Sequence, residues 1–259
     1  MQALACKMIV ALLVWFPLIA CSGSSDERAL RALKKMQASD FFENSAQQLL
    51  AKAIEKGDLV QLNKALERGA DVNAVGRDGM TPLFWAISKQ NIDGFRFLLE
   101  HGADPNIVVE LPDGFQESEA GAMEMAARMK DSRYLRLLLE HGGNPNTIID
   151  SEGQIPLLYR AIMSRQSDNV TLLVEFGADI DHQDRAGETP LMQAATARIF
   201  GIALLLLRQG ADPTIKNQWG NAPAYIVKQF GNRGIDTRTD DLSAYYEFVE
   251  ELRKRGLLD

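Results

Sequence analysis

The hydrophobic positions of the chain recur in five similar stretches, and each apolar run is closed by a glycine motif, GAD or GGN. The stretches are KALERGAD, FLLEHGAD, LLLEHGGN, LVEFGAD and LLLRQGAD, and their glycines are Gly69, Gly102, Gly142, Gly177 and Gly210. The intervals between these glycines are similar, and the longest runs from Gly102 to Gly142. Apolar residues three and four positions apart form one face of a helix, and glycine favours the left-handed conformation that ends a helix. The pattern therefore predicts a repeated unit that ends in an amphipathic helix.

A second, shorter helix is predicted between successive glycines, in segments such as TPLFWA and TPLMQAA. Thr81 and Thr189 can cap this helix by accepting a backbone N–H bond. Prolines fall at its predicted first position, where no N–H is needed; they are Pro82, Pro156, Pro190 and Pro223. Each unit is therefore predicted to be two helices, joined to the next unit by a turn-rich segment that we call a finger.

These segments resemble ankyrin repeats, whose pattern includes T-P-L-H-x-A and a period of about 33 residues. The resemblance covers residues from about 46 to 230. It implies an all-α fold, a solenoid of stacked helix-turn-helix units with hairpin-like fingers. Terminal repeats of such arrays differ from the others because they have a polar outer face. We therefore expect an N-terminal cap at about 46–70, repeats at about 71–230 and a capping helix at about 240–257.

The third repeat departs from the pattern. The interval from Gly102 to Gly142 is longer than the family's period, and Gly121 to Ala126 stands where T-P-L-H-x-A is expected, without the threonine or the proline. An insertion on one face of a solenoid is commonly a binding element. The extended finger 105–120 is therefore either a contact element or a tolerated surface insertion. In the fourth repeat, Arg160 replaces an expected alanine, which indicates a local adjustment of helix packing.

An uncharged apolar run from Met8 to Ala20 precedes the repeats, with Lys7 ahead of it. A positive residue, an apolar stretch and small residues are typical of a secretory signal. The run is too short for a membrane span, which needs about 20 residues. The sequence LIAC at 18–21 resembles the lipobox of bacterial lipoproteins, which implies a lipid on Cys21. An ordinary signal peptide and a buried apolar helix are the alternatives.

The lipobox resemblance implies a signal peptide at 1–20, followed by the lipidated cysteine and a linker or short helix at 21–45. The ankyrin resemblance implies a repeat domain, with its caps, at 46–259. The serine at position 22 is the pattern usual for lipoproteins of the outer membrane. The protein is accordingly expected in the periplasm, on a membrane through its lipid anchor. Translation from Met36 would instead give a cytoplasmic copy with the repeats complete.

The composition argues against nucleic-acid binding and against an internal disulfide. The net charge of the chain is -7, and it becomes -8 when residues 1–20 are removed, because they contain one lysine. An acidic chain lacks the basic footprint that nucleic acids require. Cys6 lies in the predicted signal, so the processed chain would carry no thiol beyond Cys21 and form no internal disulfide.

No catalytic constellation is found, and we expect neither an enzyme nor a cofactor. His101 and His141 precede helix-ending glycines, where a polar or cationic side chain is favoured, and His182 stands alone in a finger. Because the three histidines belong to different repeats, no metal site is expected. The chain lacks the G-x-S-x-G motif of serine hydrolases.

Ankyrin repeats bind proteins through their finger tips and the inner surface of their helices, and a solenoid offers an extended surface for this purpose. The resemblance implies these contact residues: Arg77, Asp78, Met80, Ser88, Lys89, Phe115, Glu117, Glu119, Ser151, Glu152, Gln154, Arg185, Glu188, Gln218, Trp219 and Asn221. Trp219 is the sharpest candidate, since aromatic residues dominate interface hot spots; folding back onto the terminal helix is its alternative. Trp85 is expected in the core.

Three functions fit an anchored protein-binding chain, which we expect to be monomeric without its partner. The first is an immunity protein, because the chain resembles ankyrin-type immunity lipoproteins that neutralise lipase effectors of type VI secretion. The second is a periplasmic adaptor that supports an endogenous envelope enzyme. The third, an enzyme or metal-binding protein, has the least support from the residues.

Overall fold

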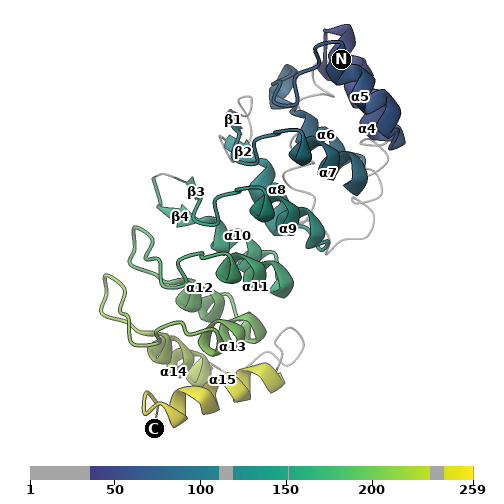
Figure 1. Ribbon diagram of the computed structural model, residues 1–259. Coiled ribbons are helices and arrows are strands. Elements are labelled where there is room, and N and C mark those ends of the chain that lie inside the picture. The colour runs from purple at the N-terminus through teal and green to yellow at the C-terminus, as the bar shows by residue number, and fades with distance from the viewer. Residues whose placement is uncertain (1–35, 111–118, 151, 234–241, 259) are drawn as a thin grey trace. The chain divides into compact units, whose positions relative to one another are not determined.

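The computed structural model describes residues 36–110, 119–150, 152–233 and 242–258 (Figure 1). The predicted signal peptide, Cys21 and most of the predicted linker lie outside these residues. Phe115, Glu117 and Ser151 lie outside them as well. The chain divides into two compact units, Met1–Asn144 and Pro145–Asp259, which are described separately below as the N-terminal and C-terminal units.

The N-terminal unit consists of helix pairs joined by fingers. Its described helices are α3 (Ala38–Phe41), α4 (Ser45–Lys56), α5 (Leu59–Glu67), α6 (Pro82–Ser88), α7 (Ile92–Glu100), α8 (Ala122–Arg128) and α9 (Arg133–Glu140), with a 3-10 turn at Arg77–Gly79. Within a pair, α4 packs on α5, α6 on α7 and α8 on α9. Between pairs, α4 contacts α6, α5 contacts α7, and α7 contacts α9. First helices and second helices therefore form separate rows, as the predicted fold requires.

The C-terminal unit repeats this arrangement, and its fingers project from one side of the helix pairs (Figure 1). Its described elements are β3 (Ile148–Asp150), β4 (Ile155–Pro156), α10 (Leu157–Met163), α11 (Ser167–Glu175), α12 (Pro190–Thr196), α13 (Phe200–Arg208), α14 (Pro223–Arg233) and α15 (Leu242–Lys254). The first helices α10, α12 and α14 contact one another in order, and α13 lies between α11 and α15. The predicted fold is confirmed in both units.

Both predicted threonine caps are confirmed. The Thr81 hydroxyl accepts the Phe84 N–H at 3.2 Å, and the Thr189 hydroxyl accepts the Met192 N–H at 3.3 Å. A proline follows each threonine at the first helical position. Pro156 differs from the prediction, because it precedes α10 instead of beginning it. It pairs with Ile148 in the β3–β4 ladder, which keeps its backbone extended.

The glycines end their helices as predicted. Their φ angles run from 84° at Gly69 to 103° at Gly210, a region that side chains with a Cβ rarely adopt. The two repeat histidines are also explained by the helix end: the Nδ1 atoms of His101 and His141 each lie 2.8 Å from the carbonyl oxygen four residues earlier.

Residues 36–44, which the sequence analysis assigned to the linker or short helix, pack against the rest of the N-terminal unit. Met36, Phe41 and Phe42 are buried. Both phenylalanine rings contact Trp85, with centroids 5.9 and 6.4 Å from its ring. Trp85 lies in the core as expected, fully buried, and its indole N–H donates to the Ala51 carbonyl at 2.8 Å. The apolar character of this segment explains why it folds onto the first helix pair.

The third repeat enters its first helix through a β-ladder. Strand β1 (Val108–Glu110) pairs antiparallel with β2 (Glu119–Gly121), and Val108 lies opposite Gly121. Helix α8 follows at once, and the residue before it supplies no side-chain cap. One helical turn apart on α8, Glu124 and Arg128 form a buried ion pair at 2.5 Å. The segment from Gly121 to Ala126 therefore takes the predicted place of the missing motif.

Candidate partner-binding surface

Each finger of the C-terminal unit is organised by one side chain that accepts backbone N–H bonds. Asp150 accepts from Glu152 and Gly153, at 3.0 and 3.2 Å. Asp184 accepts from residues 186 and 188, both at 2.8 Å. Asn217 accepts from residues 219 and 221, at 3.1 and 3.0 Å. The sequence analysis missed this set, although an Asp or Asn recurs at the same place in each of these repeats.

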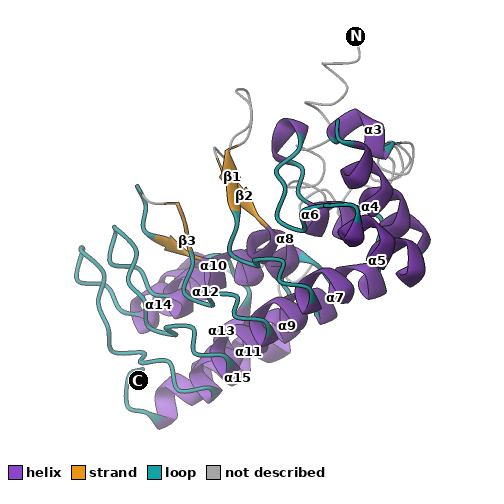
Figure 2. Ribbon diagram, turned by 45° about the horizontal axis from the view of Figure 1, so that its top comes forward, coloured by secondary structure: helices purple, strands orange, loops and turns teal. Residues whose placement is uncertain are grey.

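Neighbouring fingers are joined through their backbones. The Arg185 N–H donates to the Gly153 carbonyl at 2.9 Å, and the Gln218 N–H donates to the Ala186 carbonyl at 3.0 Å. Figure 2 shows these fingers side by side within the C-terminal unit. The three finger tips around Glu152, Arg185 and Trp219 therefore form one continuous surface, whose spacing these hydrogen bonds set.

The predicted contact residues of these three fingers fall into two groups. Glu152, Gln154, Arg185, Gln218 and Trp219 are exposed, whereas Glu188 and Asn221 are half-buried. The Trp219 side chain is 62% exposed, so it does not fold back onto the terminal helix. Three fingers thus present polar, charged and aromatic side chains to solvent.

The first finger offers less than predicted. Arg77 is exposed, and its guanidinium pairs with Glu43 at 2.5 Å. Asp78 is half-buried and adopts a left-handed backbone with φ of 53°. Met80 requires a correction, because it is 1% exposed and belongs to the core. It directly precedes the Thr81 cap of α6, where its side chain turns inward, so it cannot contact a partner in this conformation.

Ser88 and Lys89, at the end of α6, are occupied within the N-terminal unit. The Ser88 hydroxyl donates to the Trp85 carbonyl at 2.7 Å. The Lys89 ammonium donates to the Met36 carbonyl at 2.8 Å, lies 3.3 Å from Glu55 and sits 4.4 Å above the Trp85 ring. Its side chain is only 6% exposed. Lys89 therefore fastens the N-terminal segment, and its predicted role as a contact must be corrected.

Only the base of the extended finger is described. Glu119 opens β2, opposite Glu110. Whether the finger 105–120 binds a partner or is a tolerated insertion stays a prediction.

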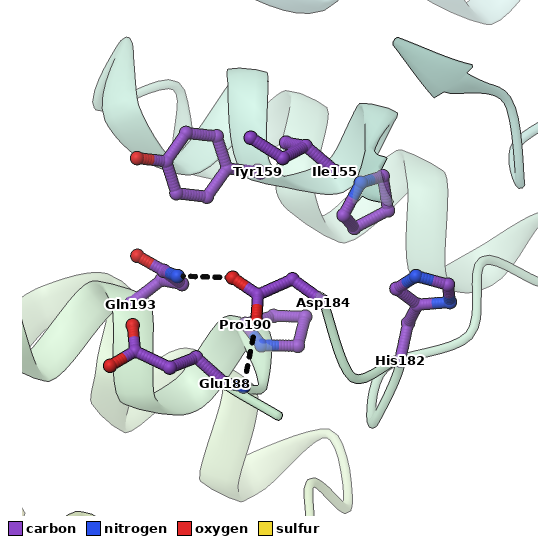
Figure 3. A pocket seen from close by; sticks show the side chains of 8 residues that line it. Ile155, Tyr159, His182, Asp184, Glu188, Pro190 and Gln193 are labelled. Carbon is purple, nitrogen blue, oxygen red and sulfur yellow. Dashed lines mark hydrogen bonds between the residues drawn. The ribbon is translucent and has the colours of Figure 1, made fainter. Parts of the chain in front are cut away.

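A small pocket lies between the fourth and fifth repeats. It is lined by Ile155, Pro156, Tyr159, His182, Asp184, Glu188, Pro190 and Gln193, which we call the inter-finger pocket. Tyr159 and Ile155 face it from the fourth repeat, while Asp184, Glu188 and Gln193 face it from the next repeat, with His182 at one end (Figure 3). The space of about 210 Å³ in front of these residues includes open solvent, so the pocket is a shallow surface depression and not an enclosed small-molecule site.

Two carboxylates make the pocket acidic. The second Asp184 oxygen accepts from the Gln193 amide at 3.0 Å. Partial burial and the Asp184 charge raise the pKa of Glu188, against a hydrogen bond from Asn217. Burial also raises the pKa of Tyr159 above its ordinary value. The pocket thus joins an aromatic wall to negative charge.

Two properties of the described residues bear on chemistry. Among them, no group of three or more His, Cys, Asp or Glu side chains is arranged to hold a metal ion. None of the described helices has both the length and the apolar character needed to cross a membrane.

Stacked helix pairs with a row of joined fingers define the class of protein-binding repeat domains. The family model for ankyrin repeats, in three copies, matches residues 18–108 and 122–217. The chain therefore belongs to the ankyrin-repeat family.

Among curated proteins, Protein PhlB of Serratia liquefaciens is 32% identical over 154 residues, which cover 60% of this chain and 64% of PhlB. The chain spans only 8% and 33% of the length of two longer curated relatives.

Among solved structures, an ankyrin repeat domain from Acinetobacter baumannii AYE has a TM-score of 0.61 at 24% identity, covering 81% of this chain and 98% of that one. A chain in the structure of the endopeptidase Bd0816 with the immunity protein Bd3460, from Bdellovibrio bacteriovorus, has a TM-score of 0.56 at 23% identity. The match covers 77% of this chain and 97% of that one. Such structural similarities show the fold alone.

Proposed function

We propose that this protein is a lipid-anchored immunity protein of the bacterial envelope, which binds a secreted toxin and blocks it. The observation that carries the proposal is the joined row of finger tips, which exposes Glu152, Arg185 and Trp219 on one surface of the C-terminal unit. A rigid row with an exposed tryptophan suits a tight protein contact, since large aromatic side chains lose little entropy on binding.

The position of the chain would complete the mechanism. The resemblance of residues 18–21 to a lipobox favours an anchor at Cys21, and a polar linker would hold the repeats at the membrane surface. A toxin that attacks lipids, such as a phospholipase delivered by type VI secretion, acts at that surface. The anchored repeats would cover its active site or its membrane-docking face. The Bd3460 complex supports the proposal to this extent: one protein of this fold is described as an immunity protein.

The test is protection of cells that lack the gene, during contact with toxin-delivering siblings. Wild-type protein is expected to restore survival. Cys21→Ser is expected to protect less, because the protein would no longer be concentrated at the membrane. Trp219→Ala is expected to lower affinity for the toxin by about 30-fold, the loss typical of a hot spot. The matched control is Tyr246→Ala, since Tyr246 is equally exposed, at 62%, but lies on α15.

A pull-down with the processed chain carrying Cys21→Ser identifies the partner. A stoichiometric toxin whose activity the chain abolishes supports the proposal. Capture of a resident envelope enzyme, with no loss of protection on deleting the gene, would replace it with the adaptor function.

A further inference from the structure

We propose that the inter-finger pocket receives an arginine side chain of the partner protein. The inference rests on the proposed function only in taking the ligand to be a protein. It specifies which side chain of the partner binds at the inter-finger pocket, and the proposed function does not specify this.

The first argument is uncompensated charge. Asp184 is held in place by two backbone N–H groups and by Gln193, and Glu188 stands beside it. Within the described part of the chain, neither carboxylate pairs with a lysine or arginine. Burial beside Asp184 raises the pKa of Glu188, which shows that its charge is disfavoured there. A cation placed between the two carboxylates would remove that cost.

The other charged groups around the pocket do not fill this role. Arg160 follows Tyr159 on α10 and acts on its phenol, but it is not among the lining residues. His182 directs its Nε2 atom to the Gln154 carbonyl at 2.9 Å. The Arg185 guanidinium donates to the Glu152 carbonyl at 3.4 Å, and Arg185 does not line the pocket.

The second argument is shape. Tyr159, Ile155 and Pro190 supply apolar surface beside the carboxylates, against which the methylene stem of a long side chain can lie. A planar guanidinium can stack on an aromatic ring and bind carboxylates through paired N–H groups, which an ammonium cannot do. Asn217 hydrogen-bonds Glu188 and accepts the Trp219 N–H, so it connects the pocket to the finger that bears Trp219. An arginine in the pocket would therefore share a contact region with that tryptophan.

The test uses a defined probe, so it does not need the partner. The processed chain with Cys21→Ser is titrated with Nα-acetyl-arginine methylamide and followed by two-dimensional NMR. The amide signals of Tyr159, Glu188 and Gln193 are expected to shift and saturate at millimolar concentrations. The citrulline analogue has the same shape without the charge, and it is expected to bind about five- to tenfold more weakly. The lysine analogue is expected to fall between the two.

Two variants complete the test. Glu188→Gln is expected to bring the arginine probe down to the level of citrulline, whereas Glu175→Gln, an exposed position on α11, leaves its affinity unchanged. Equal binding of arginine and citrulline by the wild-type chain, or no saturable shift, overturns the proposal without any variant. Toxin neutralisation together with that result would leave the immunity function standing and the arginine pocket disproved. Arginine selectivity in a chain that neutralises no toxin would mean the reverse.

Discussion

Glu124 and Glu188 are both at least partly buried, but their carboxylates have different surroundings. Glu124 is buried in the irregular third repeat and pairs with Arg128 of the same helix. Glu188 is half-buried in a finger of regular length, beside a second carboxylate. Arg128 compensates the first charge, whereas no lysine or arginine among the described residues pairs with the second. The comparison sets a carboxylate that is paired within the fold against one that the proposed arginine would pair.

The entries to the first helices differ in the same sense. In the regular fifth repeat, the buried Thr189 hydroxyl caps α12 and Pro190 begins it. In the third repeat, the β1–β2 ladder leads directly into α8, with no side-chain cap. In the third repeat, the β-ladder therefore takes the place of the threonine cap and the proline, and the stability of this repeat depends on different interactions.

The largest effect is expected from breaking the buried ion pair. Arg128→Ala would leave the Glu124 carboxylate buried without its cation, which costs about 3–5 kcal/mol. Urea unfolding of the processed chain measures this, with Trp85 fluorescence reporting the N-terminal unit in a Trp219→Phe background.

The double variant Glu124→Leu/Arg128→Met is the control. It removes both charges and is expected to recover most of the loss, since apolar residues of similar volume often replace a buried pair at little cost. A loss below about 1 kcal/mol for Arg128→Ala would show that the pair is not structural.

The fold was predictable because its determinants are local. The helix-ending glycines, the threonine caps and the prolines at 82 and 190 each act within a few residues, so spacing alone reveals them. Two features escaped. The compensation of Glu124 by Arg128 was not recognised in the irregular repeat. The linker prediction missed that Phe41 and Phe42 cover Trp85, a contact between residues far apart in the sequence.

The glycines that end the second helices are expected to contribute equally to stability in the irregular repeat and in the next one. Gly142, in the irregular repeat, and Gly177, in the next repeat, have φ of 88° and 91°, and a Cβ at either position would meet no atom within 4 Å. Gly142→Ala and Gly177→Ala should therefore each cost about 1–2 kcal/mol from backbone strain alone. Thermal and urea unfolding would measure both.

Gly201→Ala is the matched control. Gly201 lies within α13 and is also without neighbours at the Cβ position. Its helical backbone suits alanine, so the substitution should stabilise the protein by up to about 1 kcal/mol. Unequal costs at Gly142 and Gly177 would show that the irregular repeat also differs at its helix end.

A smaller loss is expected at the regular helix entry. Thr189→Ala removes the hydroxyl that accepts the Met192 N–H and should cost about 1 kcal/mol. Thr189→Ser keeps the acceptor and should retain most of the stability. Equal losses in the two variants would mean that the methyl group of the buried threonine matters more than its cap.

The binding surface was less predictable than the fold. The resemblance located finger tips, and Trp219 and Arg185 are indeed exposed. It could not show that Met80 turns into the core or that Lys89 is bound by the Met36 carbonyl, because both depend on residues brought together by folding. The inter-finger pocket escaped for the same reason, since its walls come from two repeats.

The smallest effect is expected at Glu188, and its sign is opposite to that of Arg128→Ala. Because the folded protein raises the pKa of Glu188 above its ordinary value of 4.5, the ionised side chain costs stability above the folded pKa. That cost disappears as the pH falls below the ordinary value, where the group is protonated in both states. Glu188→Gln should therefore stabilise the free protein by a few tenths of a kcal/mol at pH 7, a small figure because solvent screens a half-exposed charge. The difference from wild type should vanish near pH 4, which urea unfolding at both pH values would measure. If Glu188→Gln stabilises the free chain and lowers its affinity for the arginine probe, Glu188 contributes to binding at the expense of stability. If the substitution destabilises the chain at pH 7, Glu188 contributes to the fold, as Glu124 does.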